Sequence, residues 1–197
     1  GGGRNGKGFI DEMLLYALGA YGYKGHLELL TSKFKAGSNV ELRNCHKKRL
    51  VLFTEPEDSV AEQFRLNNIK ALTGDEDQNA RGHYSMDTNT RIFATFVSEC
   101  NKPPALKGDK GQAIISRLIK LDFESTFTND EALLAQHDPS NRVYYYPEDE
   151  SLKQQDFKAS HFCAFFEYIV KHHQAYGDLY IPSCARAAAL KYLQSED

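Results

Sequence analysis

The first eight residues have the composition and spacing of a loop that binds phosphate. They read Gly1-Gly2-Gly3-Arg4-Asn5-Gly6-Lys7-Gly8 and fit the pattern G-x-x-x-x-G-K. Glycines let the backbone curl until successive N–H groups converge on phosphate oxygens, and a following helix points its positive end at the same anion. Lys7 would reach the β- and γ-phosphates of a nucleotide. The residues expected to contact the nucleotide are Gly1, Gly3, Asn5, Gly6, Lys7 and Gly8.

Gly8 departs from the usual pattern, because a Ser or Thr that binds magnesium normally stands at this position. A glycine-rich start can also be a flexible tag or linker. The amphipathic segment that follows without a break argues for the phosphate loop, since a tag has no reason to join a helix directly. A phosphate loop normally follows a strand, so we expect this chain to be a piece of a longer protein.

Acidic residues follow a compact apolar run, where a metal ligand for a bound nucleotide is expected. Leu50–Thr54 predicts a buried parallel strand, and Glu55 and Glu57 come after it. Hydrolysis of ATP needs an acid that holds Mg²⁺ and a group that aligns the attacking water. Glu55 is the first choice for this work and Glu57 the second. The alternative is that these acids simply cap a loop or a helix.

Two more polar residues stand beside predicted elements. Asn101 ends the next apolar strand, where a neutral amide could bond the γ-phosphate or the attacking water, although asparagine is also a common turn residue. Arg117 precedes a further apolar run. An arginine offered to the nucleotide of a neighbouring subunit would stabilise the charge of the transition state. The alternative for Arg117 is an ordinary surface arginine.

Helices and apolar strands alternate along the chain and would position these residues. The expected helices are Phe9–Tyr23, 39–48, Val60–Leu72, Gly111–Arg117, Asp156–Tyr176 and Pro182–Leu193. The expected strands are Leu27–Leu30, Leu50–Thr54, Ile92–Ser98 and Leu118–Phe123, with a hairpin formed by Ala80–Tyr84 and Thr90–Ala94 around a polar tip. This alternation predicts an α/β fold with a central parallel sheet. We expect residues 1–125 to form the core and residues 126–197 a C-terminal helical appendage.

Composition limits the possible functions. The chain has 197 residues, 41% hydrophobic and 26% charged, and a net charge of −3, which argues against a passive, strongly basic DNA coat. No apolar run approaches the roughly 18 residues that span a bilayer. The four cysteines form no Cys-x-x-Cys pair, so they predict packing rather than a zinc or redox site. We therefore expect an intracellular protein without a membrane partner.

In this order, the motifs resemble those of superfamily III helicases. The resemblance is closest to the poxvirus-type branch in primase-helicases of large DNA viruses and in some phages and plasmids. The glycine-rich loop, with asparagine before its second conserved glycine, is typical of that branch. The other matching segments are Lys48–Glu57 (Walker B), Lys70–Asp75 with Ala80-Arg81 and Tyr84, Cys100–Pro103 (sensor asparagine), and Arg117–Phe127 (arginine finger).

The resemblance implies an AAA+ type P-loop NTPase core that uses ATP and Mg²⁺. It implies a ring, usually a hexamer, that moves along single-stranded DNA during viral or plasmid replication, at the host-cell replication site if viral. The primase portion of the parent polypeptide would be a further partner. The family's pore-facing region corresponds here to residues that include four candidate DNA-binding cations, which are Lys70, Arg81, His83 and Arg91.

Two other functions stay open on the sequence alone. One is a nucleotide-binding or DNA-binding oligomerisation module that does not hydrolyse ATP, which Gly8 favours. The other is a small-molecule P-loop kinase. A kinase would need an arginine-rich lid, whereas residues 124–155 contain only Arg142, so the kinase ranks third.

Overall fold

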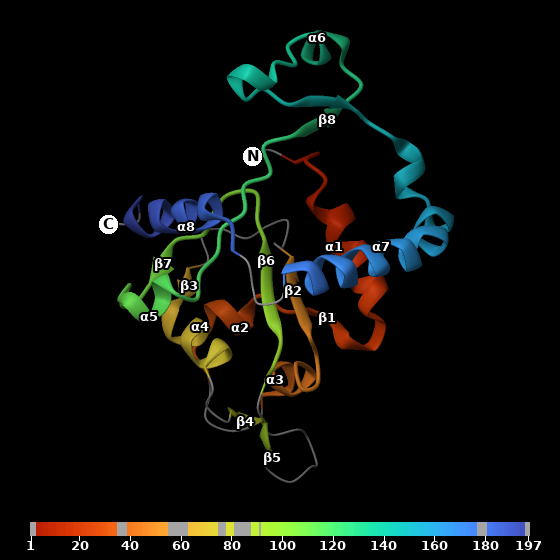
Figure 1. Cartoon of the computed structure of the whole chain (residues 1–197). Coiled ribbons are helices and arrows are strands. Elements are labelled where there is room, and N and C mark those ends of the chain that lie inside the picture. The colour runs from red at the N-terminus through yellow and green to blue at the C-terminus, as the bar shows by residue number, and fades with distance from the viewer. Residues whose placement is uncertain are drawn as a thin grey trace. The chain divides into compact units, whose positions relative to one another are not determined.

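The computed structural model describes residues 3–34, 39–54, 63–74, 78–80, 88–90, 92–176 and 181–195 (Figure 1). The chain forms two compact units, and each is discontinuous in sequence. The first unit joins Gly1–Gly19 to Leu121–Pro182, and the second joins Ala20–Lys120 to Ser183–Asp197. The division expected from the sequence, 1–125 and 126–197, groups the segments differently and stays a prediction.

The second unit is built on a three-stranded parallel sheet. Its strands lie in the order β1 (Gly22–Gly25), β2 (Leu50–Thr54) and β6 (Thr95–Glu99). The first four residues of β2 are buried, as expected for a central strand that hydrogen-bonds on both sides. The expectation of an α/β fold with a parallel sheet is confirmed.

Short helices bury their apolar residues against β2. They are α2 (Glu28–Thr31), α3 (Val40–Asn44), α4 (Leu66–Thr73), α5 (Gln112–Ile115) and α8 (Ser183–Ser195). Val51 and Phe53 point to the same side of β2 because alternate strand residues share a face. They form one hydrophobic cluster with residues of these helices, including Leu30, Leu66 and Ile114. Burial of this cluster is the main driving force for folding of the unit.

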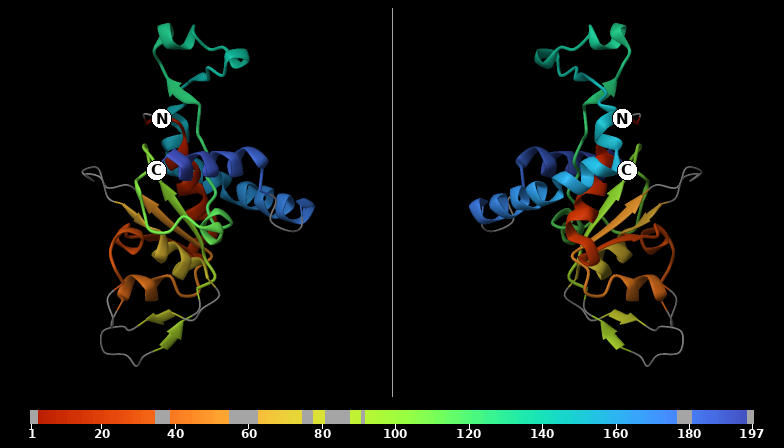
Figure 2. Two further views of the ribbon diagram at one scale, coloured as in Figure 1. Left: turned by 90° about the vertical axis from the view of Figure 1, so that its left-hand side faces the viewer. Right: turned by 90° about the vertical axis from the view of Figure 1, so that its right-hand side faces the viewer.

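Two smaller strand pairs extend the second unit. Strand β3 (Phe64–Arg65) pairs in parallel with β7 (Leu106–Lys107), and β4 (Gln78–Ala80) pairs antiparallel with β5 (Thr88–Thr90). The expected hairpin is therefore present, with shorter strands that begin two residues earlier. In Figures 1 and 2, the β4–β5 hairpin lies beyond the edge of the sheet where β2 and β6 begin.

The first unit pairs its two long helices. Helix α1 (Lys7–Leu18) packs against α7 (Gln155–Tyr176) through the rings of Phe9 and Phe157, 6.1 Å apart, and of Tyr16 and Phe162, 5.3 Å apart. Between these helices in sequence lie β8 (Thr126–Thr128), α6 (Glu131–Leu134) and β9 (Tyr145–Pro147), and β8 and β9 form a parallel pair. The described residues also form three 3₁₀ turns, which are η1 (Gly19–Tyr21), η2 (Pro139–Asn141) and η3 (Glu150–Lys153).

Two predicted strands are absent from the described residues. Leu27–Leu30 lies mostly in helix α2, because a four-residue apolar run does not distinguish strand from helix. Leu118–Phe123 forms no strand. It crosses from one compact unit to the other at Lys120, and the backbone N–H of Lys120 donates to the carbonyl of Ala185 in α8 rather than to a strand.

Other predicted elements differ in their ends. The first helix was expected to run to Tyr23, but it ends at Leu18, since Gly19 adopts a φ of 49° and Gly22–Gly25 pairs with β2. The helix expected over Val60–Leu72 begins only at Leu66, after strand β3. The helices expected around α3, α5, α7 and α8 are confirmed. Within the described segments, no helix is both long and apolar enough to cross a membrane.

Candidate functional site

The glycine-rich loop has a backbone that only certain residues accept. Gly6 is the N-cap of α1 and has a φ of 81°, and Arg4 has a φ of 57°. Glycine reaches this left-handed region without the clash that a Cβ causes, whereas a non-glycine residue there is strained. Such strain is concentrated at functional sites. The first hydrogen bond of the helix runs from the N–H of Ile10 to the carbonyl of Gly6, at 3.2 Å.

Strand β8 holds this loop from one side. The backbone N–H of Phe127 donates to the carbonyl of Arg4 at 2.7 Å. The Phe127 ring lies 3.3 Å from the position that a Cβ on Gly6 would occupy. A side chain at Gly6 would therefore be strained by its φ and crowded by the ring, so the loop conformation depends on glycine at this place.

A hydrogen bond joins the side chains of Lys7 and Asn5 within the loop. Lys7 is the first residue of α1, and its ammonium donates to the side-chain oxygen of Asn5 at 3.1 Å. Asn5 is buried, with 8% of its surface exposed. The first turn of α1 contains no acid, so the partial positive charge of the helix N-terminus is not neutralised from within the helix. The start of α1 therefore suits a bound anion.

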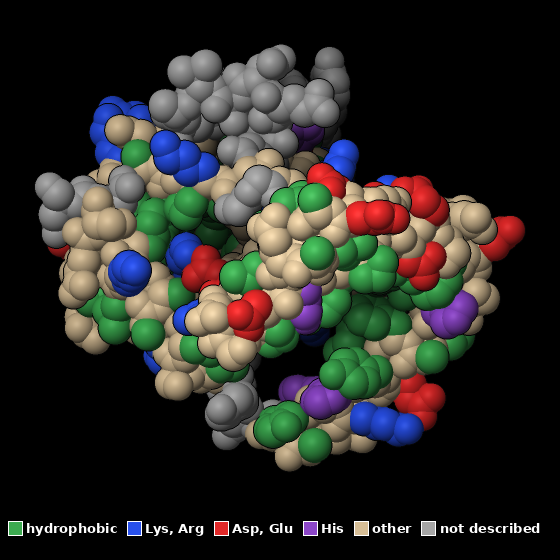
Figure 3. Space-filling model, turned by 90° about the horizontal axis from the view of Figure 1, so that it is seen from above, with side chains coloured by type: hydrophobic (Ala, Val, Ile, Leu, Met, Phe, Trp, Pro, Cys, Tyr) green, Lys and Arg blue, Asp and Glu red, His purple; other side chains and the backbone are tan. Residues whose placement is uncertain are grey.

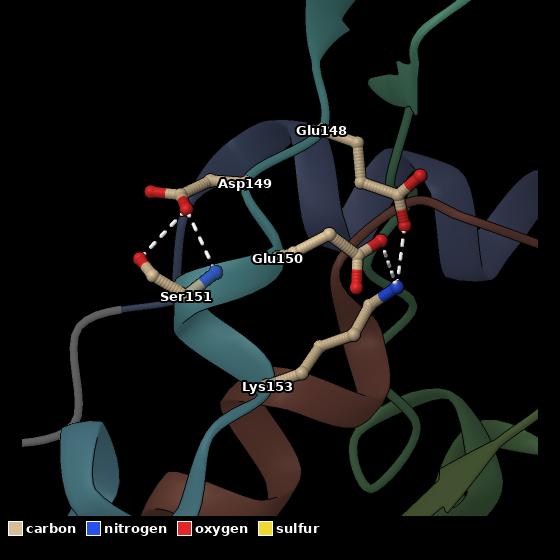
Figure 4. A network of polar contacts seen from close by, with 5 residues as sticks. All are labelled: Glu148, Asp149, Glu150, Ser151 and Lys153. Atoms are coloured by element: carbon tan, nitrogen blue, oxygen red, sulfur yellow. Dashed lines mark hydrogen bonds and ion pairs between the residues drawn. The ribbon is translucent and has the colours of Figure 1, made fainter.

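An acidic turn in the first unit is already neutralised in part by its own lysine. Lys153 donates to Glu148 at 2.6 Å and to Glu150 at 3.0 Å, and the Asp149 carboxylate accepts from the backbone and hydroxyl of Ser151 (Figure 4). The hydrogen bond from Lys153 lowers the pKa of Glu148, and the positive charge of Arg4 adds to that effect. Among the described residues, no group of three His, Cys, Asp or Glu side chains could hold a metal ion. The turn is therefore a capped structural element.

The predicted catalytic acids and the predicted sensor residue follow the C-terminal ends of two strands in the sheet of the second unit. Thr54 at the end of β2 is paired with Glu99 at the end of β6, so the segments after both strands leave the same edge. Asn101 follows β6 and is exposed. Glu55 and Glu57, predicted to hold magnesium, lie outside the described residues.

Arg117 lies two residues after the end of α5 and is exposed. Its guanidinium donates to the carbonyl of Ala113 at 2.6 Å, which satisfies an end group of its own helix. The interpretation as an arginine finger requires this hydrogen bond to exchange for a nucleotide phosphate. Lys7 and the loop belong to the first unit, and Asn101 and Arg117 belong to the second.

Of the four candidate DNA-binding cations, Lys70 is described. It lies in the last turn of α4, and its ammonium is 3.3 Å from a carboxylate oxygen of Asp109, whose side chain is 79% exposed. Such an exposed pair contributes little stability, so Lys70 can exchange Asp109 for a phosphate. Arg81, His83 and Arg91 lie outside the described residues, as does Tyr84. On the face shown in Figure 3, Lys and Arg side chains are scattered in small groups rather than joined in one patch.

An aromatic cluster beside the loop was not expected from the sequence. Phe127 and Tyr146 are register partners in the β8–β9 pair, with ring centroids 5.9 Å apart. The ring of His137 meets Tyr146 edge-on at 5.0 Å, and its Nδ1 is buried with no hydrogen-bond partner among the described residues. The Tyr144-Tyr145-Tyr146 run was the available signal, but only the strand register shows which tyrosine faces Phe127.

A second network escaped the sequence analysis and lies in the second unit. The Tyr23 hydroxyl donates to Glu41 at 2.8 Å and accepts from Asn44 at 3.1 Å. Burial raises the pKa of Tyr23, and the Glu41 carboxylate raises it further. Lys48 caps the carbonyl of Ala20 at 2.7 Å. These bonds fasten α3 and the following turn to the start of β1, so their role is structural.

Comparison with known proteins gives no family for this chain. No protein-family model matches it, and no curated protein matches it.

Proposed function

We propose that this chain is the ATP-hydrolysing motor of a superfamily III DNA helicase, with an AAA+ type P-loop NTPase core. The observation that carries the proposal is the loop at the start of α1. It combines a left-handed Gly6 at the helix N-cap with a lysine in the first turn, in a sequence that fits the phosphate-loop pattern. This arrangement suits the binding of nucleotide phosphates through backbone N–H groups, the helix dipole and an ammonium group.

The sheet of the second unit supports the same proposal. Parallel strands whose C-terminal ends lie at one edge suit the placement of an acid and a polar sensor residue near a nucleotide. Glu55 would hold Mg²⁺ and align water, with Glu57 as the alternative ligand, and Asn101 would bond the γ-phosphate or the water. Single-stranded DNA would contact Lys70, Arg81, His83 and Arg91 in a ring of subunits.

The test is ATP hydrolysis by the purified chain with and without single-stranded DNA. We expect turnover that DNA stimulates. Lys7→Ala removes the ammonium that stabilises the phosphates, so the rate should fall roughly a hundredfold or more. Lys171→Ala is the control, since Lys171 is an exposed helical lysine paired with Glu167 of its own helix, and it should leave the rate unchanged. A rate that is the same in Lys7→Ala would contradict the proposal.

The second candidate is a module that binds nucleotide without hydrolysing it. Gly8 favours this candidate, because the hydroxyl that usually binds Mg²⁺ is missing. Glu55→Gln separates the two functions. In the motor, this change should keep ATP bound and stop hydrolysis. In the module, it should change neither ATP binding nor the already absent turnover.

A further inference from the structure

We propose that Tyr146 is the platform on which the base of the bound nucleotide stacks. This inference rests on the proposed function, since it assigns the base-binding part of the site whose phosphates lie on the glycine-rich loop. All of the residues involved belong to the first compact unit.

The first step is the position of Phe127 between the loop and Tyr146. Phe127 contacts the loop twice, through its N–H to the carbonyl of Arg4 and through its ring against Gly6. The same ring lies 5.9 Å from the ring of Tyr146. Phe127 therefore links Tyr146 to the loop through a direct contact on each side. In a nucleotide, the base lies one sugar away from the phosphates, so a base and its phosphates would need neighbouring places of this kind.

The second step is that the Tyr146 ring is both fixed and accessible. Tyr146 is the register partner of Phe127 on one face of the β8–β9 pair. The ring of His137 lies edge-on to the ring of Tyr146, with the ring centroids 5.0 Å apart. These two aromatic neighbours hold the ring in place, and the residue as a whole stays 37% exposed. An aromatic ring held in one orientation loses little conformational entropy when a base stacks on it.

The third step is the buried nitrogen of His137. Its Nδ1 has no hydrogen-bond partner among the described residues. A buried polar atom in this state is rare in folded proteins and points to a partner that binds there. The edge of a base presents hydrogen-bond donors and acceptors, and a base bound at Tyr146 could pair with this nitrogen once the His137 ring turns, because the atom is closed to solvent in the unbound chain. The unpaired nitrogen is an observation independent of the loop.

The adjacent tyrosine supplies a matched control. Tyr145 precedes Tyr146 in the same strand and has the same side chain. Successive strand residues point to opposite faces, so Tyr145 lies on the face away from Phe127. A substitution at Tyr145 removes one tyrosine ring and its hydroxyl from strand β9, as a substitution at Tyr146 does. It leaves the proposed platform unchanged.

The experiment measures equilibrium binding of ATP and of inorganic tripolyphosphate to the purified chain. Tyr146→Leu should weaken ATP binding roughly tenfold, the loss expected for one stacked base, and should leave tripolyphosphate binding unchanged. Tyr146→Phe should bind ATP as the native chain does, and Tyr145→Leu should change neither ligand. ATP binding that survives Tyr146→Leu intact would overturn the inference.

The two ligands separate this inference from the proposed function. A native chain that binds tripolyphosphate as tightly as ATP would retain its phosphate loop and have no base platform. A chain that binds neither ligand would overturn both. Fluorescence gives a second measurement because the chain contains no tryptophan. ATP should quench the emission of Tyr146→Trp and tripolyphosphate should not, while Tyr145→Trp should respond to neither.

Discussion

Lys7 and Asn5 illustrate what the sequence motif implies and what the fold adds. The motif places a lysine next to Gly6, and the structure shows that its ammonium rests on the buried side-chain oxygen of Asn5. This contact holds the charge near the loop, where the proposed nucleotide would bind. Preorganisation of this kind reduces the entropy lost on binding. Asn5 is therefore expected to position Lys7, whereas the sequence motif predicted only that Asn5 would contact the nucleotide.

Cys45 should make the folded chain sensitive to alkaline pH. Its thiol is fully buried, and burial, together with the charge of Glu41, raises its pKa from 9.0 to about 12. Between these values the unfolded chain loses the thiol proton while the folded chain keeps it. The free energy of unfolding should therefore fall as pH rises, by at most about 1.4 kcal/mol per pH unit from this group.

The test is the free energy of unfolding in urea, measured at a series of pH values below and above 9.0, the ordinary pKa of the thiol. Cys45→Ala removes the titrating thiol, so its stability should depend less steeply on alkaline pH than that of the native chain. Cys163→Ala, at an exposed cysteine, should keep the native slope. Equal slopes for Cys45→Ala and the native chain would show that the thiol does not contribute.

At the scale of elements, the sequence predicts long periodic segments well and short ones poorly. Helix α7 and strand β2 were predicted to within one residue, because a long amphipathic repeat and a compact, bounded apolar run are strong local signals. Leu27–Leu30 was predicted wrongly because its helix is fixed by distant residues. Asn68 donates to the carbonyls of Leu29 and Ser32, and Arg65 donates to that of Thr31.

Asn68 should therefore be needed to dock α2 on α4. Its amide makes two hydrogen bonds, of 2.8 Å to Leu29 and 2.7 Å to Ser32, and the residue is 5% exposed. Asn68→Ala leaves both carbonyls without this donor, so the free energy of unfolding should drop by about 1–3 kcal/mol. Asn67→Ala, at the exposed neighbour in the same helix turn, should change it by about 0.5 kcal/mol or less. Urea denaturation of the two variants gives the comparison, and equal losses would contradict the docking role.

The candidate site shows the same limit at a larger scale. The loop residues were recognisable because the spacing of glycine and lysine is a local property of the sequence. Phe127 and Tyr146 were not, because their approach to the loop depends on the β8–β9 register and on a contact between distant parts of the chain. Asn101 and Arg117 could be proposed from strand ends and from resemblance, whereas the hydrogen bond from Arg117 to Ala113 could not.

At the scale of the whole molecule, a ring would make one subunit's activity depend on the next. If Arg117 is the proposed arginine finger, Arg117→Ala removes the guanidinium that would stabilise a neighbour's nucleotide, and an assembly made only of this variant should lose roughly a thousandfold or more of its ATP turnover. Mixed with native subunits, the variant should lower ATP turnover by more than its fraction of the mixture.

The control is Arg186→Ala, at an exposed arginine on α8 of the same unit, which should only dilute the native protein. Steady-state ATPase rates over a series of mixing ratios measure the effect, and simple dilution by Arg117→Ala would remove Arg117 from the mechanism.

Each compact unit is completed by a segment from late in the chain. Phe127 holds the glycine-rich loop and helix α7 packs on the helix that follows it, and both are translated well after the loop. The second unit likewise receives α8 last, where Tyr192 hydrogen-bonds to the carbonyl of Pro104. A ribosome releases the chain from its N-terminus onward. The loop therefore emerges before strand β8, which supports it in the folded chain, has been synthesised. Contacts between such distant segments slow folding, and a nascent chain interrupted before α8 would leave the ribosome with its second unit unfinished.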